Sequence, residues 1–178
     1  NSALKSMRTK GPVPGLAELF AKLSLDFHNV TSKDLGWTVI PALNASGRMG
    51  QSNLSLEVLI SEDPKERDIL STKIIDLNEM RKNLVNEAAL KTAGQAQESL
   101  SNHNGKLCIV FNEEIHKGVT GILANKIMNT YEVPSLAITD NDGIYAGSMR
   151  SCRGVVATDF LKEFGDFFIA YGGHNAAA

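Results

Sequence analysis

Cysteine is scarce in this sequence, which argues against a disulfide framework and against a zinc site. The 178 residues include two cysteines. Cys108 lies in the apolar run LCIVF and Cys152 in RSCRG, and neither has a partner at the spacing of a metal knuckle. We interpret both as free thiols in a reducing compartment, which predicts a cytoplasmic origin.

An excess of positive charge and long apolar runs are also lacking. The chain has 18 Lys and Arg residues against 20 Asp and Glu residues, a formal net charge of −2. No global positive field therefore attracts it to nucleic acid, so any anion binding must be local. No apolar stretch approaches the roughly 20 residues that span a bilayer, and the first residues lack the apolar core of a signal peptide. We expect no membrane segment, and we expect both ends to be cut from a longer protein.

A complete catalytic centre is missing as well. Metal-dependent phosphodiester cleavage needs clustered carboxylates and histidines. The four histidines are far apart in the sequence, at His28, His103, His116 and His174. Ser148 has no Gly-x-Ser-x-Gly elbow around it, which argues against a serine nucleophile. We therefore predict no catalytic residue and no metal site within this chain.

The first third of the sequence predicts two short helices and one strand. Apolar residues at helical spacing indicate a helix over residues 14–23, and residues 52–60 favour another. Between them, Trp37 to Ile40 favour an extended strand that Pro41 ends. Gly47 and Gly50 then allow a sharp turn.

A long helix is the best-defined element. Asp63 is the expected N-cap, Pro64 takes the first helical position, and Glu66 completes a capping-box pattern. Apolar residues continue at helical spacing without Gly or Pro until Gly94, which predicts a helix of about 30 residues or more. A helix of this length favours a connector between lobes, with a packed bundle helix as the alternative.

The second half predicts a small α/β domain that begins near residue 103. Residues 106–111 are typical of a buried strand, residues 119–131 of a helix and residues 134–139 of a second strand, so we expect a parallel pair with a right-handed crossover. Residues 143–151 favour a further strand, 158–165 a short helix and 166–171 a last strand. The fold class is α/β, with a long connecting helix leading into a domain with a mixed or partly parallel sheet.

Two groups of candidate binding residues lie in this second half. His116 and Lys117 come at the mouth of a helix, and Gly118 allows a ligand to approach the backbone; the alternative is a solvated or capping histidine. Strand alternation puts Ser148 and Arg150 on one face, where a hydroxyl beside a guanidinium suits a phosphate or carboxylate. The alternative is the polar outer face of an edge strand.

Two further groups are candidates for binding an anion. In the NASGRMG stretch, Asn44 and Arg48 stand among small residues, so an amide and a guanidinium can approach a ligand. The alternative is a turn whose arginine is solvated. Gly172, Gly173 and His174 resemble an anion nest of successive N–H groups, with the imidazole as a donor. A simple turn is the alternative.

Five motifs follow one another along the chain. They are Pro-x-x-Asn-Ala-x-Gly-Arg-Met at 41–49, Asn-x-x-Arg-Lys at 78–82, His-x-Gly-Val-x-Gly-Ile at 116–122, Gly-Ser-x-Arg-Ser at 147–151, and Gly-Gly-His with trailing alanines at 172–177. Their order resembles the RecJ family of single-strand-specific DNA exonucleases, in the DHH phosphoesterase superfamily. The resemblance covers nearly the whole chain from about Arg8 onward.

This resemblance implies a separate role for each part of the chain. Residues 1–62 would be the end of the DHH catalytic domain, 63–102 the connecting helix, and 103–178 the DHH-associated substrate-binding domain. Ser148 and Arg150 would hold the 5′ phosphate of single-stranded DNA, Arg48 would assist, and His116 and His174 would line the cleft. The Asp and His ligands of Mg²⁺ or Mn²⁺ would lie upstream of this chain. A role in DNA repair and recombination follows, with a helicase or single-strand-binding protein as a partner to test.

The chain departs from the family pattern at two positions. Ile115 stands where the family usually has Trp, which predicts looser packing of the loop. Ala42 stands where the residue is often basic, which predicts the loss of one phosphate contact. Two other functions stay open: a phosphoesterase of the same superfamily that acts on short oligonucleotides or small nucleotides, and a non-enzymatic interaction module.

Overall fold

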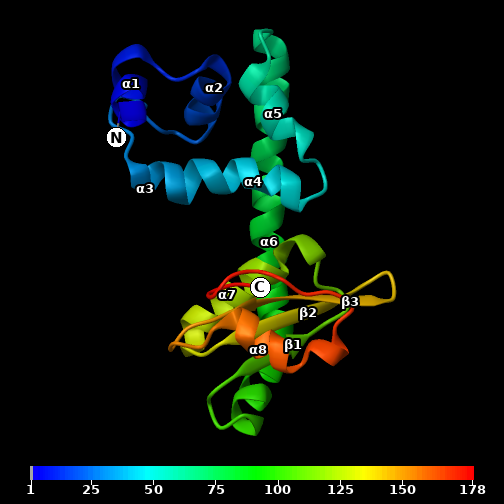
Figure 1. Cartoon of the computed structure of the whole chain (residues 1–178). Helices are drawn as coiled ribbons and strands as arrows, with labels where there is room; N and C mark the ends of the chain where they lie inside the picture. The colour runs from blue at the N-terminus through cyan, green and yellow to red at the C-terminus, as the bar shows by residue number, and fades with distance from the viewer. Residues whose placement is uncertain (1) are drawn as a thin grey trace. The chain divides into compact units, whose positions relative to one another are not determined.

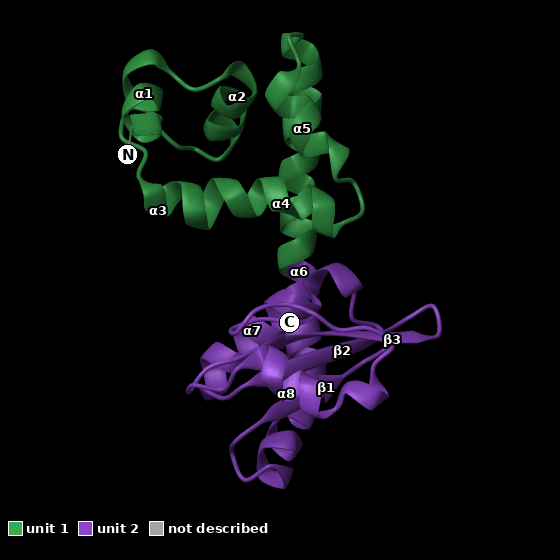
Figure 2. Ribbon diagram, in the orientation of Figure 1, with its two compact units in different colours: residues 1–82 green, residues 83–178 purple. Residues whose placement is uncertain are grey.

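The computed structural model describes residues 2–178, which fall into two compact units, 1–82 and 83–178 (Figure 2). Helix α6, Pro64–Asn102, is labelled in Figure 1 and contributes residues to both units (Figure 2). Among the described residues, none of the helices is both long enough and apolar enough to cross a membrane.

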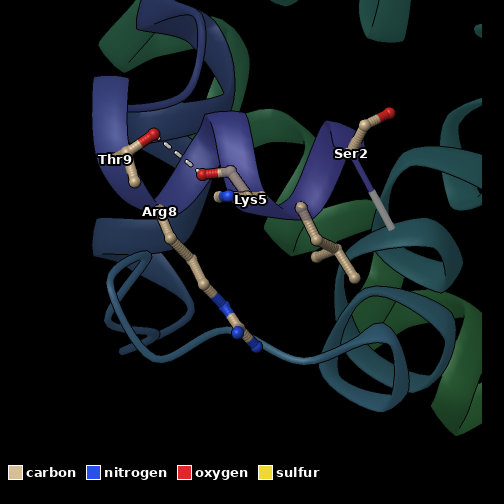
Figure 3. A pocket seen from close by; sticks show the side chains of 5 residues that line it. Ser2, Lys5, Arg8 and Thr9 are labelled. Carbon is tan, nitrogen blue, oxygen red and sulfur yellow. Dashed lines mark hydrogen bonds between the residues drawn. The ribbon is translucent and has the colours of Figure 1, made fainter.

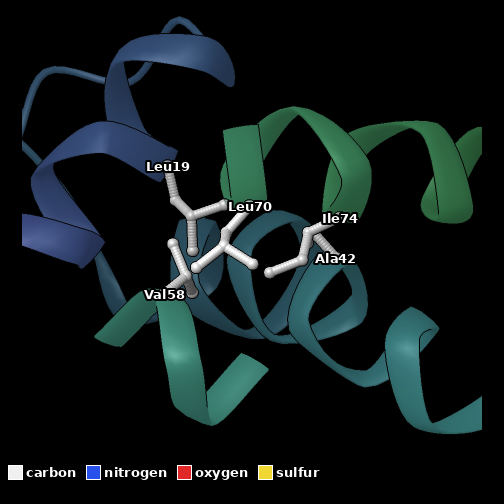
Figure 4. Packing of buried hydrophobic residues seen from close by; sticks show 5 residues of the cluster. All are labelled: Leu19, Ala42, Val58, Leu70 and Ile74. Atoms are coloured by element: carbon white, nitrogen blue, oxygen red, sulfur yellow. The ribbon is translucent and has the colours of Figure 1, made fainter. Parts of the chain in front are cut away.

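The first unit is helical. Its elements are α1 (Ser2–Lys10), α2 (Pro14–Lys22), α3 (Ser32–Asp34), the π-helix η1 (Leu35–Val39), α4 (Ile40–Arg48), α5 (Asn53–Ile60) and the first part of α6. Apolar side chains from four of these helices form one buried cluster, which Figure 4 shows as Leu19, Ala42, Val58, Leu70 and Ile74. The helices predicted over residues 14–23 and 52–60 are confirmed.

The strand predicted at Trp37 to Ile40 is wrong, because these residues are helical. The N–H of Ile40 donates to the carbonyl of Leu35, five residues back, as a π-helix requires. Pro41 follows in the first turn of α4. A proline ring in a continuous helix would collide with the carbonyl four residues earlier, and a wider π turn relieves that conflict. Pro41 was expected to end a strand, but it lies within a continuous helical segment.

Helix α6 confirms the long helix, with 39 residues from Pro64 to Asn102. The Asp63 carboxylate accepts from the N–H of Lys65 at 2.9 Å, as an N-cap does. The Glu66 carboxylate accepts from the Ser61 hydroxyl at 2.5 Å. The first contact gives a hydrogen-bond partner to an N–H group at the start of the helix, and the second fixes the Glu66 side chain. The residues around Asp63 therefore define where the helix begins.

The second unit holds a three-stranded sheet in the order β1-β2-β3, formed by β1 (Cys108–Phe111), β2 (Ser135–Asn141) and β3 (Ile144–Arg150). Strands β1 and β2 are parallel, while β2 and β3 are antiparallel. The helical elements are η2 (Lys117–Val119), α7 (Thr120–Tyr131), α8 (Ala157–Glu163) and η3 (Gly165–Phe167). The predicted α/β class with a mixed sheet is confirmed.

Each outer edge of this sheet is covered by another part of the unit. On β1, the N–H of Ile109 donates to the Ser99 hydroxyl at 2.8 Å, and the N–H of Phe111 donates to the Gln95 side chain at 3.0 Å. On β3, Met149 exchanges backbone hydrogen bonds with Ala178, of 2.6 and 3.2 Å. These contacts satisfy N–H and C=O groups that an open edge would expose.

The last predicted strand, residues 166–171, is wrong. The segment leaves η3 as irregular backbone, and Phe167 and Ile169 are 86% and 91% exposed. Aromatic and β-branched residues favour a strand only where an edge is available for pairing. The C-terminal residues 176–178 take that place beside β3 instead. The Gly172-Gly173-His174 turn therefore follows irregular backbone, not a strand.

Candidate functional site

Strand β3 presents two different faces to the helices of the second unit. Met149 is 1% exposed and packs with Ala157 and Leu161 of α8. Ser148 and Arg150 point to the opposite face, where they meet the first turn of α7. The predicted alternation of this strand is confirmed. We call Thr120, Gly121, Ser148 and Arg150 the α7–β3 cluster.

Gly121 makes room for the guanidinium of Arg150. A Cβ atom on Gly121 would lie 2.7 Å from Nη2 of Arg150 and 3.4 Å from Oγ of Ser148. Any larger residue would displace the arginine, because contacts below 3.0 Å do not occur. Arg150 also donates through Nη1 to the carbonyl of Met149 at 2.7 Å. The guanidinium is thus held in a defined place beside the Ser148 hydroxyl.

Thr120 joins the cluster through its hydroxyl, which lies 3.1 Å from the Ser148 hydroxyl. The same Thr120 hydroxyl donates to the carbonyl of Lys117 at 3.0 Å. Thr120 is only 5% exposed, whereas Ser148 and Arg150 are partly exposed. The cluster therefore combines a buried hydroxyl with a hydroxyl and a cation that a ligand can reach, at the start of a 12-residue helix whose dipole favours anions.

His116 stands directly before η2 and caps it. Its Nδ1 accepts a hydrogen bond from the N–H of Gly118 at 3.1 Å. A neutral ring that accepts at Nδ1 carries its proton on Nε2, which is the nitrogen left to donate. The loop before it is well packed, because Ile115 is 4% exposed and its carbonyl accepts from Thr139 at 2.6 Å. Ile115 is thus buried, and looser packing than with a tryptophan at this position stays a prediction.

The C-terminal turn lies beside the end of β3. Ala177 forms isolated bridges with both Arg150 and His174. The N–H of His174 donates to the carbonyl of Ala177 at 2.8 Å, so this N–H closes the turn. Nδ1 of His174 accepts from Ala176 at 3.3 Å, which again leaves Nε2 as the donor of a neutral ring. Gly173 is required here, since a Cβ on it would lie 2.2 Å from the Ala177 oxygen.

Asn44 and Arg48 lie on helix α4 in the first unit. They are four residues apart and both are exposed, so they share one face of the helix. Gly47 and Gly50 were expected to allow a sharp turn: Gly47 lies within α4, and the chain turns at Gly50, whose φ is +76°. Ala42 is fully buried in the core, so no phosphate contact is made from this position in the folded unit. We call Asn44 and Arg48 the α4 face.

Arg81 of α6 lies near the α4 face. Partial burial, and next the positive charge of Arg48, hold the pKa of Arg81 below its usual value. Its Nε donates to the Asn78 side chain at 3.2 Å, and Asn78 is 4% exposed. Two cations kept close together in this way make a local positive region on a chain whose net charge is negative.

An open pocket occurs at α1, where Figure 3 shows Ser2, Lys5, Arg8 and Thr9. Arg8 donates through Nε to the carbonyl of Val30 at 2.8 Å, and the Thr9 hydroxyl donates to the carbonyl of Lys5 at 2.9 Å. These contacts hold local structure. The chemistry that suits a phosphate lies instead in the α7–β3 cluster and on the α4 face.

Comparisons with known proteins agree with the motif order. Residues 104–178 match the DHHA1 domain family. The single-stranded-DNA-specific exonuclease RecJ of Salmonella typhimurium is 30% identical over 173 residues, which is 93% of this chain and 30% of that protein. RecJ of Bacillus subtilis is 30% identical over 166 residues, 92% of this chain and 21% of that protein.

A crystal structure of RecJ from Thermus thermophilus in complex with Mn²⁺ has the same fold, with a TM-score of 0.84 and 24% identity. The similarity covers 97% of this chain and 25% of that one. This chain is similar to RecJ proteins along nearly its whole length. It spans between a fifth and a third of the length of the curated RecJ relatives given above.

Crystal structures of the Thermus thermophilus RecJ contain Mn²⁺ or Mg²⁺. Within residues 2–178 of the present chain, no group of three or more His, Cys, Asp or Glu side chains could hold a metal ion. The residues that the structure describes therefore do not form a metal centre by themselves.

Three residues of these sites were not among the candidates drawn from the sequence. Thr120 and Gly121 lie inside the His-x-Gly-Val-x-Gly-Ile motif, and Arg81 lies inside the Asn-x-x-Arg-Lys motif. The motifs indicated that these segments take part in the site, but they did not identify these three residues. Which side chains meet was decided by the packing of α7 on β3 and of α4 on α6.

Proposed function

We propose that this chain holds the DNA in a metal-dependent exonuclease that degrades single-stranded DNA from its 5′ end. Ser148 and Arg150 bind the 5′ phosphate. His116, Gly118 and the Gly172-Gly173-His174 turn contribute further contacts in the second unit, and the α4 face contacts the DNA backbone from the first unit. Residues 1–62 are the end of the catalytic DHH domain, 63–102 the connecting helix and 103–178 the substrate-binding domain.

One observation carries this proposal: the Ser148 hydroxyl and the Arg150 guanidinium lie together beside the first turn of α7. A guanidinium and a hydroxyl both donate hydrogen bonds to phosphate oxygens, and a charge-assisted bond is the stronger kind. The names of the relatives supply the substrate, since they are described as specific for single-stranded DNA. Phosphate contacts position a strand without reading its sequence, which suits an exonuclease.

Removal of Arg150 tests the proposal in the whole protein. We expect Arg150→Ala to weaken binding of a 5′-phosphorylated single-stranded oligonucleotide by about 10- to 100-fold, the worth of a hydrogen bond to a charged group. Binding of the same oligonucleotide with a 5′ hydroxyl should change much less. Equilibrium titration at fixed salt measures both affinities.

Lys162→Ala is the matched control, because Lys162 is an exposed cation on α8, against the other face of the sheet. It should leave the preference for the 5′ phosphate unchanged. Equal affinities of wild type and Arg150→Ala for phosphorylated ends would exclude the assigned role.

A series of oligonucleotides of different lengths separates the alternative functions. Equally tight binding of dinucleotides favours a small-nucleotide phosphoesterase, and no binding at any length favours an interaction module.

The metal ions of the whole enzyme, Mg²⁺ or Mn²⁺, are held in this proposal by residues outside the present chain. The chain by itself should then show no nuclease activity with either ion. A clean preparation assayed on labelled single-stranded DNA checks this, and turnover that follows the protein through purification would contradict it. The cytoplasmic location and a helicase or single-strand-binding partner stay predictions.

A further inference from the structure

The Thr120 hydroxyl makes two hydrogen bonds that together determine where its proton lies. Its oxygen is 3.0 Å from the Lys117 carbonyl oxygen and 3.1 Å from the Ser148 hydroxyl oxygen. A carbonyl only accepts, and a threonine hydroxyl has one proton and two lone pairs. Because the Thr120 proton is used for Lys117, the proton of the second bond belongs to Ser148. Ser148 therefore donates to Thr120.

This direction has to change when Ser148 binds a phosphate. A phosphate oxygen accepts hydrogen bonds, so Ser148 must turn its single proton toward the ligand. Thr120 can then turn its own proton to the Ser148 oxygen. The Lys117 carbonyl keeps a donor, because the backbone N–H of Thr120 also donates to it. Each of the three groups thus has a partner in both arrangements, and the exchange leaves no buried polar group unsatisfied.

The geometry points to Thr120 as a positioning residue for phosphate binding, an inference that rests on the function proposed for Ser148. Thr120 holds the Ser148 oxygen beside Gly121 and reverses the direction of their shared hydrogen bond when phosphate binds. A hydroxyl that accepts one bond donates a stronger one, and the charged acceptor adds to this. Thr120 acts through Ser148, since its own side chain is only 5% exposed.

Substitution of Thr120 in the whole protein tests this role. Thr120→Val keeps nearly the same shape without the hydroxyl, and Thr120→Ser keeps the hydroxyl. The probe is a single-stranded oligodeoxynucleotide with phosphorothioate linkages, bound with and without a 5′ phosphate. We expect Thr120→Val to lower the preference for the 5′ phosphate about fivefold, the worth of one ordinary hydrogen bond, and Thr120→Ser to retain it.

A second set of variants separates positioning from a general loss of structure. In a Ser148→Ala background, Thr120→Val should cause no further loss, because the residue through which it acts is gone. An unchanged or higher preference in Thr120→Val, or an equal loss in both backgrounds, would overturn the role of Thr120. If Thr120→Val does not fold, Thr120→Ala carries the same expectation. If Ser148→Ala and Arg150→Ala leave the preference intact, the proposed function itself fails.

Discussion

The two units present similar chemical groups at different degrees of exposure to solvent. In the second unit, Ser148 is bonded to Thr120, and Arg150 lies against Gly121 and donates to a carbonyl. In the first unit, Asn44 and Arg48 lie on the exposed face of a helix. Solvent screens a charge on an exposed helix face more strongly than a charge in a partly buried cluster. We therefore infer that the second unit provides selectivity for the strand end, whereas the first unit adds general attraction to the backbone.

The largest effect is expected at Gly15, where two helices of the first unit touch. A Cβ on Gly15 would lie 1.8 Å from the backbone oxygen of Val58, which cannot move aside as a flexible side chain can. Gly15→Ala should destabilise the first unit by about 3 kcal/mol or more. Thermal unfolding measures this. Gly94→Ala is the control: nothing lies within 4 Å of it in α6, so it should stabilise by about 0.5–1 kcal/mol. Equal behaviour of the two variants would contradict the close approach of α2 and α5.

Gly121→Ala should affect binding more than folding. The atom that its Cβ would meet first is Nη2 of Arg150, the far end of a flexible side chain. The arginine can move away at little cost in stability, but it then leaves its place beside Ser148. We expect about a tenfold loss of preference for a 5′ phosphate, comparable to one charge-assisted hydrogen bond. In an Arg150→Ala background, Gly121→Ala should cause no further loss of this preference. An additive loss would show that Gly121→Ala does not act through Arg150.

A smaller effect is expected for Arg48→Ala. The residue is exposed, so its contact with a phosphate is screened by solvent, and we expect a loss of up to about fivefold in affinity. The loss should be the same for phosphorylated and unphosphorylated ends. The salt dependence should also fall, by about 0.7 in the slope of log K against log salt for one phosphate contact. A loss of affinity only for phosphorylated ends would contradict the inference that the first unit adds general attraction to the DNA backbone.

The smallest effect concerns the ion pair of Lys91 and Glu114 in the second unit. A hydrogen bond from Lys91 lowers the pKa of Glu114 below its ordinary value of 4.5, and the same bond raises the pKa of Lys91 above 10.5. The ion pair therefore stabilises the fold at pH values between the two pKa values. This stabilisation is lost as the pH falls through the pKa of Glu114. Glu114→Gln should make thermal stability less sensitive to pH between 7 and 3, and an unchanged pH dependence would show that the pair contributes nothing.

Much of the fold could be predicted locally. Helix α6 has a cap, a first-turn proline and apolar residues at helical spacing, all within its own sequence. The strands around residues 108–111, 135–141 and 144–150 are short apolar or alternating runs. The two wrongly predicted strands lie where contacts with other parts of the chain decided the secondary structure. Residues 37–40 have strand-forming side chains, yet they are part of a continuous helical segment, and residues 166–171 found no sheet edge to pair with.

The sequence by itself determined which groups could bind a phosphate, because the alternation of β3 already puts Ser148 and Arg150 on one face. It also placed the motifs in an order shared with the RecJ family. Only the tertiary structure decided which neighbours those groups have. Thr120 and Gly121 lie 28 and 29 residues before Ser148 and Arg150 along the chain, and the packing of α7 on the sheet brings them together. Hydrogen-bond direction and steric room depend on such contacts between distant residues, which no local pattern encodes.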